Sequence, residues 1–542
     1  MPKITIEGRE IECRPGIPVL QAALEAGFDI PHYCYHPGLS VVASCRLCLM
    51  EMKTPHPKTR ELVWSPKLVP SCQTPVTDGM EVRFDTDAVR ESRRHVMEYY
   101  LLNHPLDCPV CDKAGECFLQ DYAEGCGAAS SRMVEDKLKN PKKDVGPHTL
   151  LYQDRCVLCT RCVRFCDEVA GTKELAVVSR GSRCEIDVFP GQPLDNALQG
   201  NVVDLCPVGA LLDKDFLFKQ RVWLLRSTRS VSPADSRGQT IWIDHNDGRV
   251  YRVRPRFNEK VNEWWLSDEA RFGWTYVHRP DRLRQPQVRR GAAFQSARWE
   301  ELPGIVLRGL SGAGEPPPSL SGRGQGEGRS VAAVLSPMMS CEEAWLLARF
   351  VRGLAPQTTL VAGHVPVVGR DQTFPTGFVV KAEKCPNRRG IETIIEHLGG
   401  PSASFGDFLA QAVEGRFGAA YVVGGYPGEW VTPEMAAALA KIGFLVIHDL
   451  FPSPLDALAA VRIPCATWAE REGTFMNCDG LIQPFDRAIP PLEGVKADGQ
   501  LFYELAGETG LFRAATVRAK MAADVPQIKE VFLPRDLAKH AH

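Results

Sequence analysis

The sequence predicts a multidomain α/β fold, with small cysteine-rich domains in its first half and a larger α/β domain in its second. Three observations support this prediction. The chain has 542 residues, which suggests several domains rather than one core. Beyond residue 330, strand-like and helix-like segments alternate. Of the 19 cysteines, only four follow residue 210, namely Cys341, Cys385, Cys465 and Cys478.

The bulk composition narrows the classes of function. The formal net charge is −2, so nothing marks the chain as a nucleic-acid binder. No apolar run reaches the length of a membrane span, and the N-terminus "MPKITIEGRE" shows no secretory signal. We therefore expect a cytoplasmic protein with reduced thiols, in which grouped cysteines bind metal rather than form disulfides.

The first segment, 1–86, is predicted to be a ferredoxin-type β-grasp domain. "KITIEG" and "REIECR" alternate like a hairpin that turns at Glu7-Gly8. In "PVLQAALEAG", Leu20, Ala23 and Leu24 share one helical face. A cysteine-bearing loop and the strand "MEVRFD" follow, which completes the strand–strand–helix–loop–strand order of this domain.

Four further segments follow. Residues 87–127 combine a helix from Ala88 to about Asn103, which Pro105 stops, with cysteine-rich loops. After a polar connector, 146–218 form another cysteine-rich domain. Residues 219–276 contain a hairpin that turns at Asn246-Asp247-Gly248. The rest, 277–542, is the α/β domain, and it includes a low-complexity segment, 311–330, that we expect to be a disordered surface insertion.

The first cysteine group fits a [2Fe–2S] cluster, which needs four thiolates from a loop that wraps the metals. Its spacing is C-x10-C-x2-C-x23-C, formed by Cys34, Cys45, Cys48 and Cys72. The alternative is a zinc loop at Cys45 and Cys48. Cys13 is interpreted as a small buried hydrophobe, and His32 and His36 as residues that support the site or lie on the surface.

The second group fits a [4Fe–4S] cluster with one histidine ligand. In "HPLDCPVCDKAGEC" the candidates are His104, Cys108, Cys111 and Cys117. Three cysteines leave one iron open, and imidazole is a competent iron ligand. Two alternatives stay open: Cys126 as the fourth ligand with His104 only capping the helix, or tetrahedral zinc.

The third group, "CVLCTRCVRFC", fits a second [4Fe–4S] cluster. Cys156, Cys159 and Cys162 belong together, and the fourth ligand is Cys166 or Cys206. Because the Cys-Pro signature of ferredoxins belongs to Cys206, we favour Cys206. Arg155, Arg161 and Arg164 surround the triplet, either to tune its potential or as a solvated face.

The order of these motifs resembles one family. "SCRLCLMEM", "NHPLDCPVCDKAGEC", "RCVLCTRCVRFC" and "NVVDLCPVGAL" are similar to signatures of the G subunit of NADH:quinone oxidoreductase, respiratory complex I. The resemblance implies three clusters in an electron path from flavin toward quinone. It also assigns Cys206 rather than Cys166 as a ligand.

The chain departs from many bacterial relatives at a further cubane site. Where these carry "PSVCPxCxxGC" and "NEGWLCDKGRFG", this chain reads "RSVSPADSRGQT" and "NEWWLSDEARFG". Ser232 and Ser267 stand where cysteines would be, so we expect no fourth cluster. The C-terminal part resembles a degenerate, shortened molybdopterin oxidoreductase domain, through "EREGTFMNCDG" (470–480), without a metal-binding cysteine pattern. We therefore expect no molybdopterin there.

The resemblance implies an electron-transfer subunit of NADH:quinone oxidoreductase without its own substrate pocket. It implies one [2Fe–2S] and two [4Fe–4S] clusters, with FMN only in a partner subunit. The expected partners are the flavin/NADH-binding subunit and other iron–sulfur subunits, which would hold the chain on the inner face of the membrane. The alternatives are an electron-transfer subunit of a soluble NAD-linked hydrogenase or formate dehydrogenase, and a zinc-stabilised scaffold.

Overall fold

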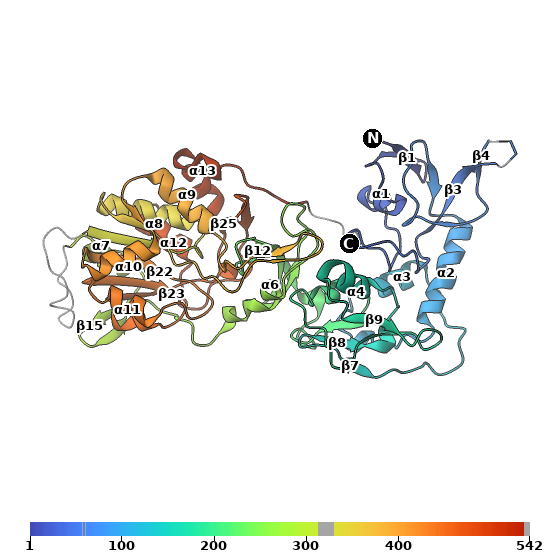
Figure 1. Cartoon of the computed structure of the whole chain (residues 1–542), viewed down its shortest axis with the longest axis horizontal. Coiled ribbons are helices and arrows are strands. Elements are labelled where there is room, and N and C mark those ends of the chain that lie inside the picture. The colour runs from blue at the N-terminus through green and yellow to red at the C-terminus, as the bar shows by residue number, and fades with distance from the viewer. Residues whose placement is uncertain (57, 60, 313–329, 536–542) are drawn as a thin grey trace.

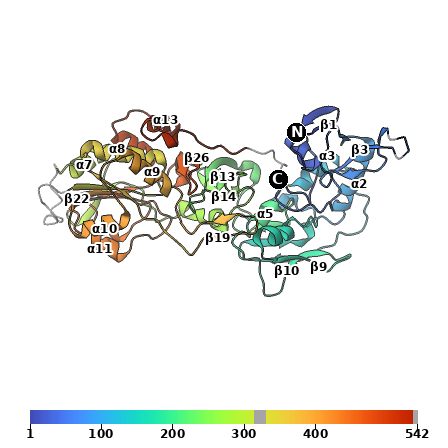
Figure 2. The ribbon, with the colours of Figure 1, turned by 45° about the horizontal axis from the view of Figure 1, so that its top comes forward.

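The computed structural model describes residues 1–56, 58–59, 61–312 and 330–535, and the chain forms two lobes along its long axis (Figure 1). The N-terminal lobe, at the right in Figure 1, contains the three cysteine groups, and the C-terminal lobe contains the α/β domain. A three-stranded antiparallel sheet lies between them (Figure 2). Most of the low-complexity segment 311–330 lies outside the described residues.

Residues 1–86 form a mixed sheet with one helix, α1 (Val19–Glu25), packed on it. The strand order is β2-β1-β6-β3-β4, with β5 paired to β3, and β1 and β6 run parallel. Glu7 and Gly8 have φ of 51° and 80°, as the predicted tight hairpin turn requires. The strands are β1 (Lys3–Ile6), β2 (Arg9–Glu12), β3 (Leu49–Pro55), β4 (Leu62–Trp64), β5 (Val69–Pro70) and β6 (Glu81–Arg83).

Two helices connect this sheet to the next cysteine loops. Helix α2 (Asp87–Leu101) begins at Thr86, whose hydroxyl accepts a hydrogen bond from the Val89 amide at 3.4 Å. It ends two residues before the predicted Asn103. Helix α3 (Phe118–Cys126) packs against α2.

The remainder of the N-terminal lobe is built from short elements around the third cysteine group. Its strands form a sheet of order β11-β8-β7 and a hairpin of β9 and β10. The elements are β7 (Lys142–Asp144), β8 (Thr149–Tyr152), α4 (Arg161–Arg164), β9 (Leu175–Val178), β10 (Glu185–Val188), α5 (Asn201–Leu205) and β11 (Leu211–Asp213). Helix α4 continues into a π-helical turn over Phe165–Ala170.

The sheet between the lobes contains the predicted second hairpin. Strands β12 (Arg226–Val231), β13 (Thr240–Asn246) and β14 (Arg249–Pro255) are antiparallel neighbours. Asp247 and Gly248 have φ of 48° and 72° at the β13–β14 turn. The short helix α6 (Asp268–Phe272) follows, and its N-cap is Ser267.

The C-terminal lobe is an eight-stranded sheet of order β16-β15-β24-β23-β22-β17-β18-β21, in which the six strands from β24 to β21 are parallel. Chain order reverses between β22 and β17, as in a doubly wound fold. The strands are β15 (Gln287–Arg290), β16 (Ala293–Ser296), β17 (Ser330–Leu335), β18 (Thr359–Ala362), β21 (Ser402–Ala403), β22 (Phe417–Val423), β23 (Phe444–Asp449) and β24 (Val461–Pro464). Two small hairpins lie outside this sheet. β19 (Gln372–Thr373) pairs with β20 (Val379–Val380) at the junction with the N-terminal lobe, and β25 (Gly473–Met476) pairs with β26 (Ile482–Phe485).

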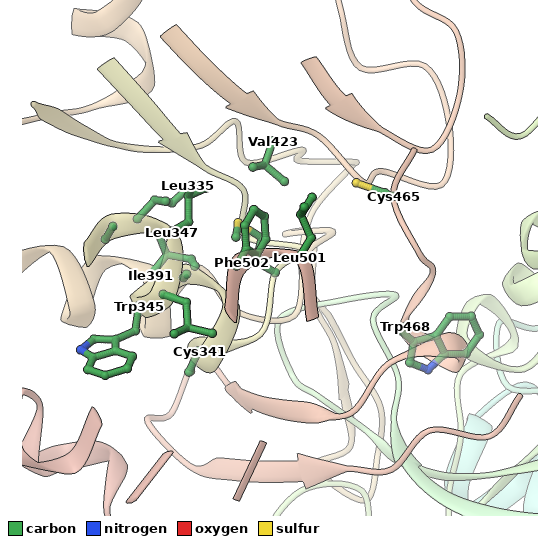
Figure 3. Close-up of a cluster of buried hydrophobic side chains, with 14 of the residues drawn as sticks. Leu335, Cys341, Trp345, Leu347, Ile391, Val423, Cys465, Trp468, Leu501 and Phe502 are labelled. Carbon is green, nitrogen blue, oxygen red and sulfur yellow. The ribbon is translucent and has the colours of Figure 1, made fainter. Parts of the chain in front are cut away.

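Helices cover both faces of this sheet, as Figures 1 and 2 show. On one face, Trp345, Ile391 and Phe502 from three helices share a core with Leu335 and Val423 of the sheet (Figure 3). The opposite face has a separate core beneath α10 and α11. The helices are α7 (Leu302–Leu310), α8 (Cys341–Leu354), α9 (Arg388–Leu398), α10 (Phe405–Val413), α11 (Pro433–Leu439), α12 (Asp498–Leu505) and α13 (Ala514–Asp524).

Candidate iron–sulfur sites

The structure brings the four cysteines of the first group together. Cys34 lies in the loop after α1, Cys45 and Cys48 precede β3, and Cys72 follows β5; all four are buried. The Cys34 thiol interacts with those of Cys45 and Cys72, and Cys48 with that of Cys72. The hydrogen bond with Cys72 lowers the pKa of Cys48. Four converging thiols on one loop-rich segment fit a binuclear cluster.

Two residues with positive φ shape this loop. Ala43 and Arg46 have φ of 50° and 59°, which curls the backbone between Cys34 and Cys48. The Tyr33 amide donates to the Cys45 sulfur at 3.4 Å. Such donors stabilise charge on a thiolate.

The two histidines beside Cys34 are buried rather than on the surface. The His32 ring Nδ1 lies 2.8 Å from the Ile30 carbonyl oxygen, and His36 Nδ1 accepts from the Gly38 amide at 3.1 Å. The His36 ring also lies 5.2 Å and 5.5 Å from the rings of Trp264 and Trp265, measured between centroids. These contacts anchor the Cys34 loop to residues near the centre of the molecule.

The second group spans the segment between α2 and α3. Cys108 begins a 3-10 turn, Cys108–Val110, and Cys117 is the N-cap residue of α3. The Cys111 thiol interacts electrostatically with Cys108, and Cys117 with Cys111. Cys108 is exposed, whereas Cys111 and Cys117 are buried.

His104 lies three residues beyond the end of α2, and its imidazole is held in the neutral form. Burial, together with the nearby cations Arg155 and Lys137, lowers its pKa to about 4. The neutral ring is the form that ligates metal. Within the described residues, Cys126 instead donates from its sulfur to the Tyr122 carbonyl at 3.1 Å and interacts with Arg93.

The third group surrounds a single cavity. Cys156, Cys159, Cys162 and Cys206 all line it, together with apolar side chains such as Leu151 and Ile186. Leu158 and Thr160 have φ of 50° and 60°, which wraps the loop around this space. Cys206 directly follows α5. The remote cysteine of the Cys-Pro signature therefore lies at the same cavity as the triplet, and its role as a ligand stays a prediction.

Cys166 does not line that cavity. It lies in the π-helical turn, where its carbonyl accepts from the Thr172 amide at 2.8 Å and the Lys173 amide at 3.2 Å. Burial and the Glu174 carboxylate raise the pKa of its thiol to about 12. Burial also raises the pKa of Cys159 to about 11 and that of Cys162 well above its usual value, so the position of Cys166 outside the cavity is what distinguishes it from them.

The arginines of the third motif are buried, so their interpretation as a solvated face is wrong. Arg155, Arg161 and Arg164 are 2%, 2% and 8% exposed. Arg155 donates to the Asp107 carboxylate from Nε at 3.1 Å and from Nη2 at 2.7 Å. Buried cations beside buried thiols fit anionic iron–sulfur clusters.

A hydrogen-bonded network occupies the position of the further cubane. Ser267 Oγ accepts from Gln239 Nε2 at 3.1 Å, and the Ser267 amide donates to Gln239 Oε1 at 2.8 Å. Gln239 Nε2 also lies 3.4 Å from Asp235 Oδ2. Ser232 Oγ accepts from the Ala234 amide at 3.3 Å. All four side chains are buried.

The sequence motifs alone did not identify Asp235 and Gln239 as members of this network. The spacing Ser232-x2-Asp235-x3-Gln239 equals that of the three cysteines in "PSVCPxCxxGC". This match could have identified Asp235 and Gln239 from the sequence. Burial raises the pKa of Asp235 to about 6. Gln239 therefore links Ser267 and Asp235 by hydrogen bonds, whereas the Ser232 hydroxyl accepts from a backbone amide.

In the C-terminal lobe, the four cysteines lie apart from the cysteine groups of the N-terminal lobe. Cys341, Cys385 and Cys465 are buried, and Cys478 is half-buried. Cys465 lies with His448 and Asp498 in a group whose potential ligand atoms are within 4.8 Å of one another. Their neighbours satisfy them in part, because Tyr421 Oη lies 3.1 Å from His448 Nδ1.

Five family models match the chain. Residues 2–87 match a 2Fe-2S iron-sulfur cluster binding domain, and 93–132 match the NADH-ubiquinone oxidoreductase-G iron-sulfur binding region. Residues 146–212 match the ferredoxin-like domain of NADH-quinone oxidoreductase subunit 3. Residues 225–275 match a NDSU1/NuoG-like 4Fe-4S domain of NADH-ubiquinone oxidoreductase, and 401–508 match molybdopterin oxidoreductase.

Curated relatives agree with these matches. The G subunit of NADH-quinone oxidoreductase from Rickettsia bellii is 44% identical over 301 residues, which is 56% of this chain and 43% of the relative. The NADH-ubiquinone oxidoreductase 75 kDa subunit of Reclinomonas americana is 40% identical over 310 residues, 57% of this chain and 43% of the relative. The NADH dehydrogenase [ubiquinone] iron-sulfur protein 1 of Solanum tuberosum is 42% identical over 306 residues, 56% of this chain and 40% of the relative. The matched region thus spans less than half the length of each relative.

Among solved structures, an NAD+-reducing [NiFe]-hydrogenase in the H2-reduced state aligns with 30% identity and a TM-score of 0.36. The alignment covers 41% of this chain and 91% of that one.

Proposed function

We propose that this chain, which belongs to the family of the NADH-quinone oxidoreductase G subunits, is the iron–sulfur electron-transfer subunit of such an enzyme. Electrons would enter from a partner subunit that binds FMN and NADH and leave toward quinone. The observation that carries the proposal is a single apolar core that contains cysteines of all three groups. It includes Cys34, Cys45, Cys117, Cys159, Cys162 and Cys206, and also Cys166, which is not among the proposed ligands.

The proposed ligand sets follow the three groups. Cys34, Cys45, Cys48 and Cys72 hold one [2Fe–2S] cluster; His104, Cys108, Cys111 and Cys117 hold a [4Fe–4S] cluster; and Cys156, Cys159, Cys162 and Cys206 hold another. Each cluster supplies a one-electron couple whose potential depends on its ligands, charge and exposure. The protein fixes the positions of these sites, and the shared core encloses part of each site, whereas Cys108 of the second site is exposed.

We place the electron exit at the exposed ligand of the second site. Three exposed apolar side chains form what we call the Cys108 face: Leu106 and Val110, which flank Cys108 in the sequence, and Trp223, which packs beside Gly115 of the same loop. They are 88%, 56% and 62% exposed. Arg221, two residues before Trp223, donates to the Cys111 carbonyl at 3.0 Å and so holds these segments together. Exposed apolar groups around a cluster suit a partner that also carries iron–sulfur clusters.

The proposal includes no fourth cluster and no molybdopterin. The network of Ser232, Asp235, Gln239 and Ser267 supports the first point, since none of these is a thiolate. For the second point, the support is that the C-terminal part of the chain has no metal-binding cysteine pattern. The C-terminal lobe would act as a scaffold for other subunits. Among the described helices none is long and apolar enough to cross a membrane, so membrane attachment would depend on partners.

Metal analysis of the full chain tests the proposal. After anaerobic reconstitution, three clusters correspond to about ten irons and ten sulfides per chain. Dithionite-reduced samples should then give one binuclear and up to two cubane EPR signals. About fourteen irons would mean that a fourth cluster binds, and zinc in place of iron would refute the electron-transfer role.

A further inference from the structure

Two buried cations join the first and third sites. Arg161 and Arg164 both lie in α4, the helix that also carries Cys162. Arg164 Nη2 donates to the Cys34 carbonyl at 2.5 Å and to the Cys159 carbonyl at 3.2 Å. One guanidinium nitrogen therefore contacts the backbone of a ligand from each of the two sites.

Arg161 makes a parallel link. Its Nη1 donates to the Leu205 carbonyl at 3.3 Å, next to Cys206, and its Nη2 donates to the Tyr35 carbonyl, next to Cys34. Both guanidinium groups thus contact the loop of the first site, which lies more than 120 residues before α4 in the sequence. Helix α4 is fixed against the loop of the first site by these bonds.

Neither guanidinium forms an ion pair with a carboxylate in the described part of the chain. Their acceptors are backbone carbonyl oxygens, and Nε of each is buried without a hydrogen-bond partner. Other arginines of the molecule differ: Arg155 pairs with Asp107, and Arg271 pairs with Asp204. A guanidinium stays charged in proteins, and a buried charge without a counter-charge is strongly unfavourable.

We propose that Arg161 and Arg164 are the counter-charges of the first and third clusters. Arg164 also positions these two clusters relative to each other. This inference rests on the proposed function. Clusters held by thiolates are anionic, and each gains a further negative charge when it is reduced. A fixed cation in a buried, low-dielectric environment favours the reduced form and therefore raises the reduction potential.

The test is a redox titration followed by EPR on the anaerobically reconstituted full chain. We compare the wild type with Arg164→Gln, which removes the charge, and Arg164→Lys, which keeps it. The matched control is Arg180→Gln, because Arg180 is an exposed arginine of the same lobe. The second cluster serves as an internal reference, since its loop is linked to Arg155 instead.

We expect Arg164→Gln to make reduction of the first and third clusters about tenfold less favourable, which is about 59 mV for a one-electron couple. Arg164→Lys should retain both potentials, because the charge is kept. It should weaken the magnetic interaction between the two reduced clusters, because an ammonium group cannot hold both carbonyl groups as the planar guanidinium does. Arg180→Gln should change neither. The inference is overturned if Arg164→Gln leaves both potentials as in the wild type.

Loss of a cluster in a variant is also informative. If Arg164→Gln loads too little iron while Arg164→Lys loads fully with wild-type potentials, the charge requirement is supported. If Arg164→Lys also loses iron, the counter-charge role is overturned and the residue is a structural link only. A wild-type chain that binds no iron would instead refute the proposed function.

Discussion

Gly209 lies directly against Cys111. A β-carbon on Gly209 would lie 2.2 Å from the Cys111 sulfur, which is much closer than non-bonded atoms approach. Gly209 belongs to the segment after Cys206, and Cys111 belongs to the second site. Because Gly209 has no side chain, there is room for the Cys111 sulfur beside it.

Gly209→Ala should therefore impair loading of the second cluster. The added methyl group displaces the Cys111 sulfur or separates the two segments. Iron per reconstituted chain should fall by about four, with the binuclear EPR signal retained. Gly125→Ala is the control, because its β-carbon would meet no atom within 4 Å; full iron content in Gly209→Ala would contradict the expectation.

Cys206→Ser should abolish the third cluster, whereas Cys166→Ser should leave it intact. Only Cys206 shares the cavity with Cys156, Cys159 and Cys162. Both cysteines are buried, so the two substitutions are matched in burial and chemistry. Iron analysis and EPR distinguish them, and the reverse pattern would assign the ligand to Cys166.

Leu106→Asp should weaken transfer to the next iron–sulfur subunit without loss of iron. This substitution places a charge on the most exposed apolar side chain of the Cys108 face, where the proposed partner would exclude water. If the proposed interface loses about 1.4 kcal/mol or more, the affinity of the chain for the proposed partner should fall at least about tenfold, and the rate of quinone reduction at limiting concentrations of the two should fall with it. Val413→Asp, at a half-exposed apolar site on α10, is the control. An unchanged rate in Leu106→Asp would place the exit elsewhere.

Glu342→Gln should stabilise the C-terminal lobe at alkaline pH. Burial raises the pKa of Glu342 from 4.5 to about 7, against the opposing effect of Arg518. The folded lobe thus prefers the neutral acid, so its stability falls as the pH rises from about 4.5 and the loss is complete above about 7. A shift of this size corresponds to roughly 3 kcal/mol at most. Melting temperatures of both forms at about pH 5 and about pH 8, on either side of the shifted pKa, measure it; an equal difference at the two pH values would contradict the shift.

Local patterns predicted much of the fold. The turns at Glu7-Gly8 and at Asp247-Gly248 adopt positive φ as their residue types suggest. Close spacing predicted that Cys156, Cys159 and Cys162 belong together, and the Cys-Pro signature favoured Cys206 as the fourth member; all four line one cavity. The ligand assignments themselves remain predictions until metal is measured.

Other features depend on tertiary contacts that the spacing of residues in the sequence does not predict. Arg161 and Arg164 follow the helical pattern of α4, and only its packing on the first site's loop makes them buried. The network around Gln239 likewise depends on Ser267, 28 residues away, approaching through the fold. The sheet order β22-β17-β18 results from long-range pairing that local periodicity does not determine.

The common core of the three sites links maturation to folding. Because cysteines such as Cys34, Cys72 and Cys162 are buried once the N-terminal lobe closes, iron and sulfide reach them only while it is open. Assembly of the clusters would then belong to the folding pathway rather than follow it. An apo chain that closes too early would be a dead-end species, and cellular cluster-assembly factors would need to act on the unfolded or newly synthesised lobe.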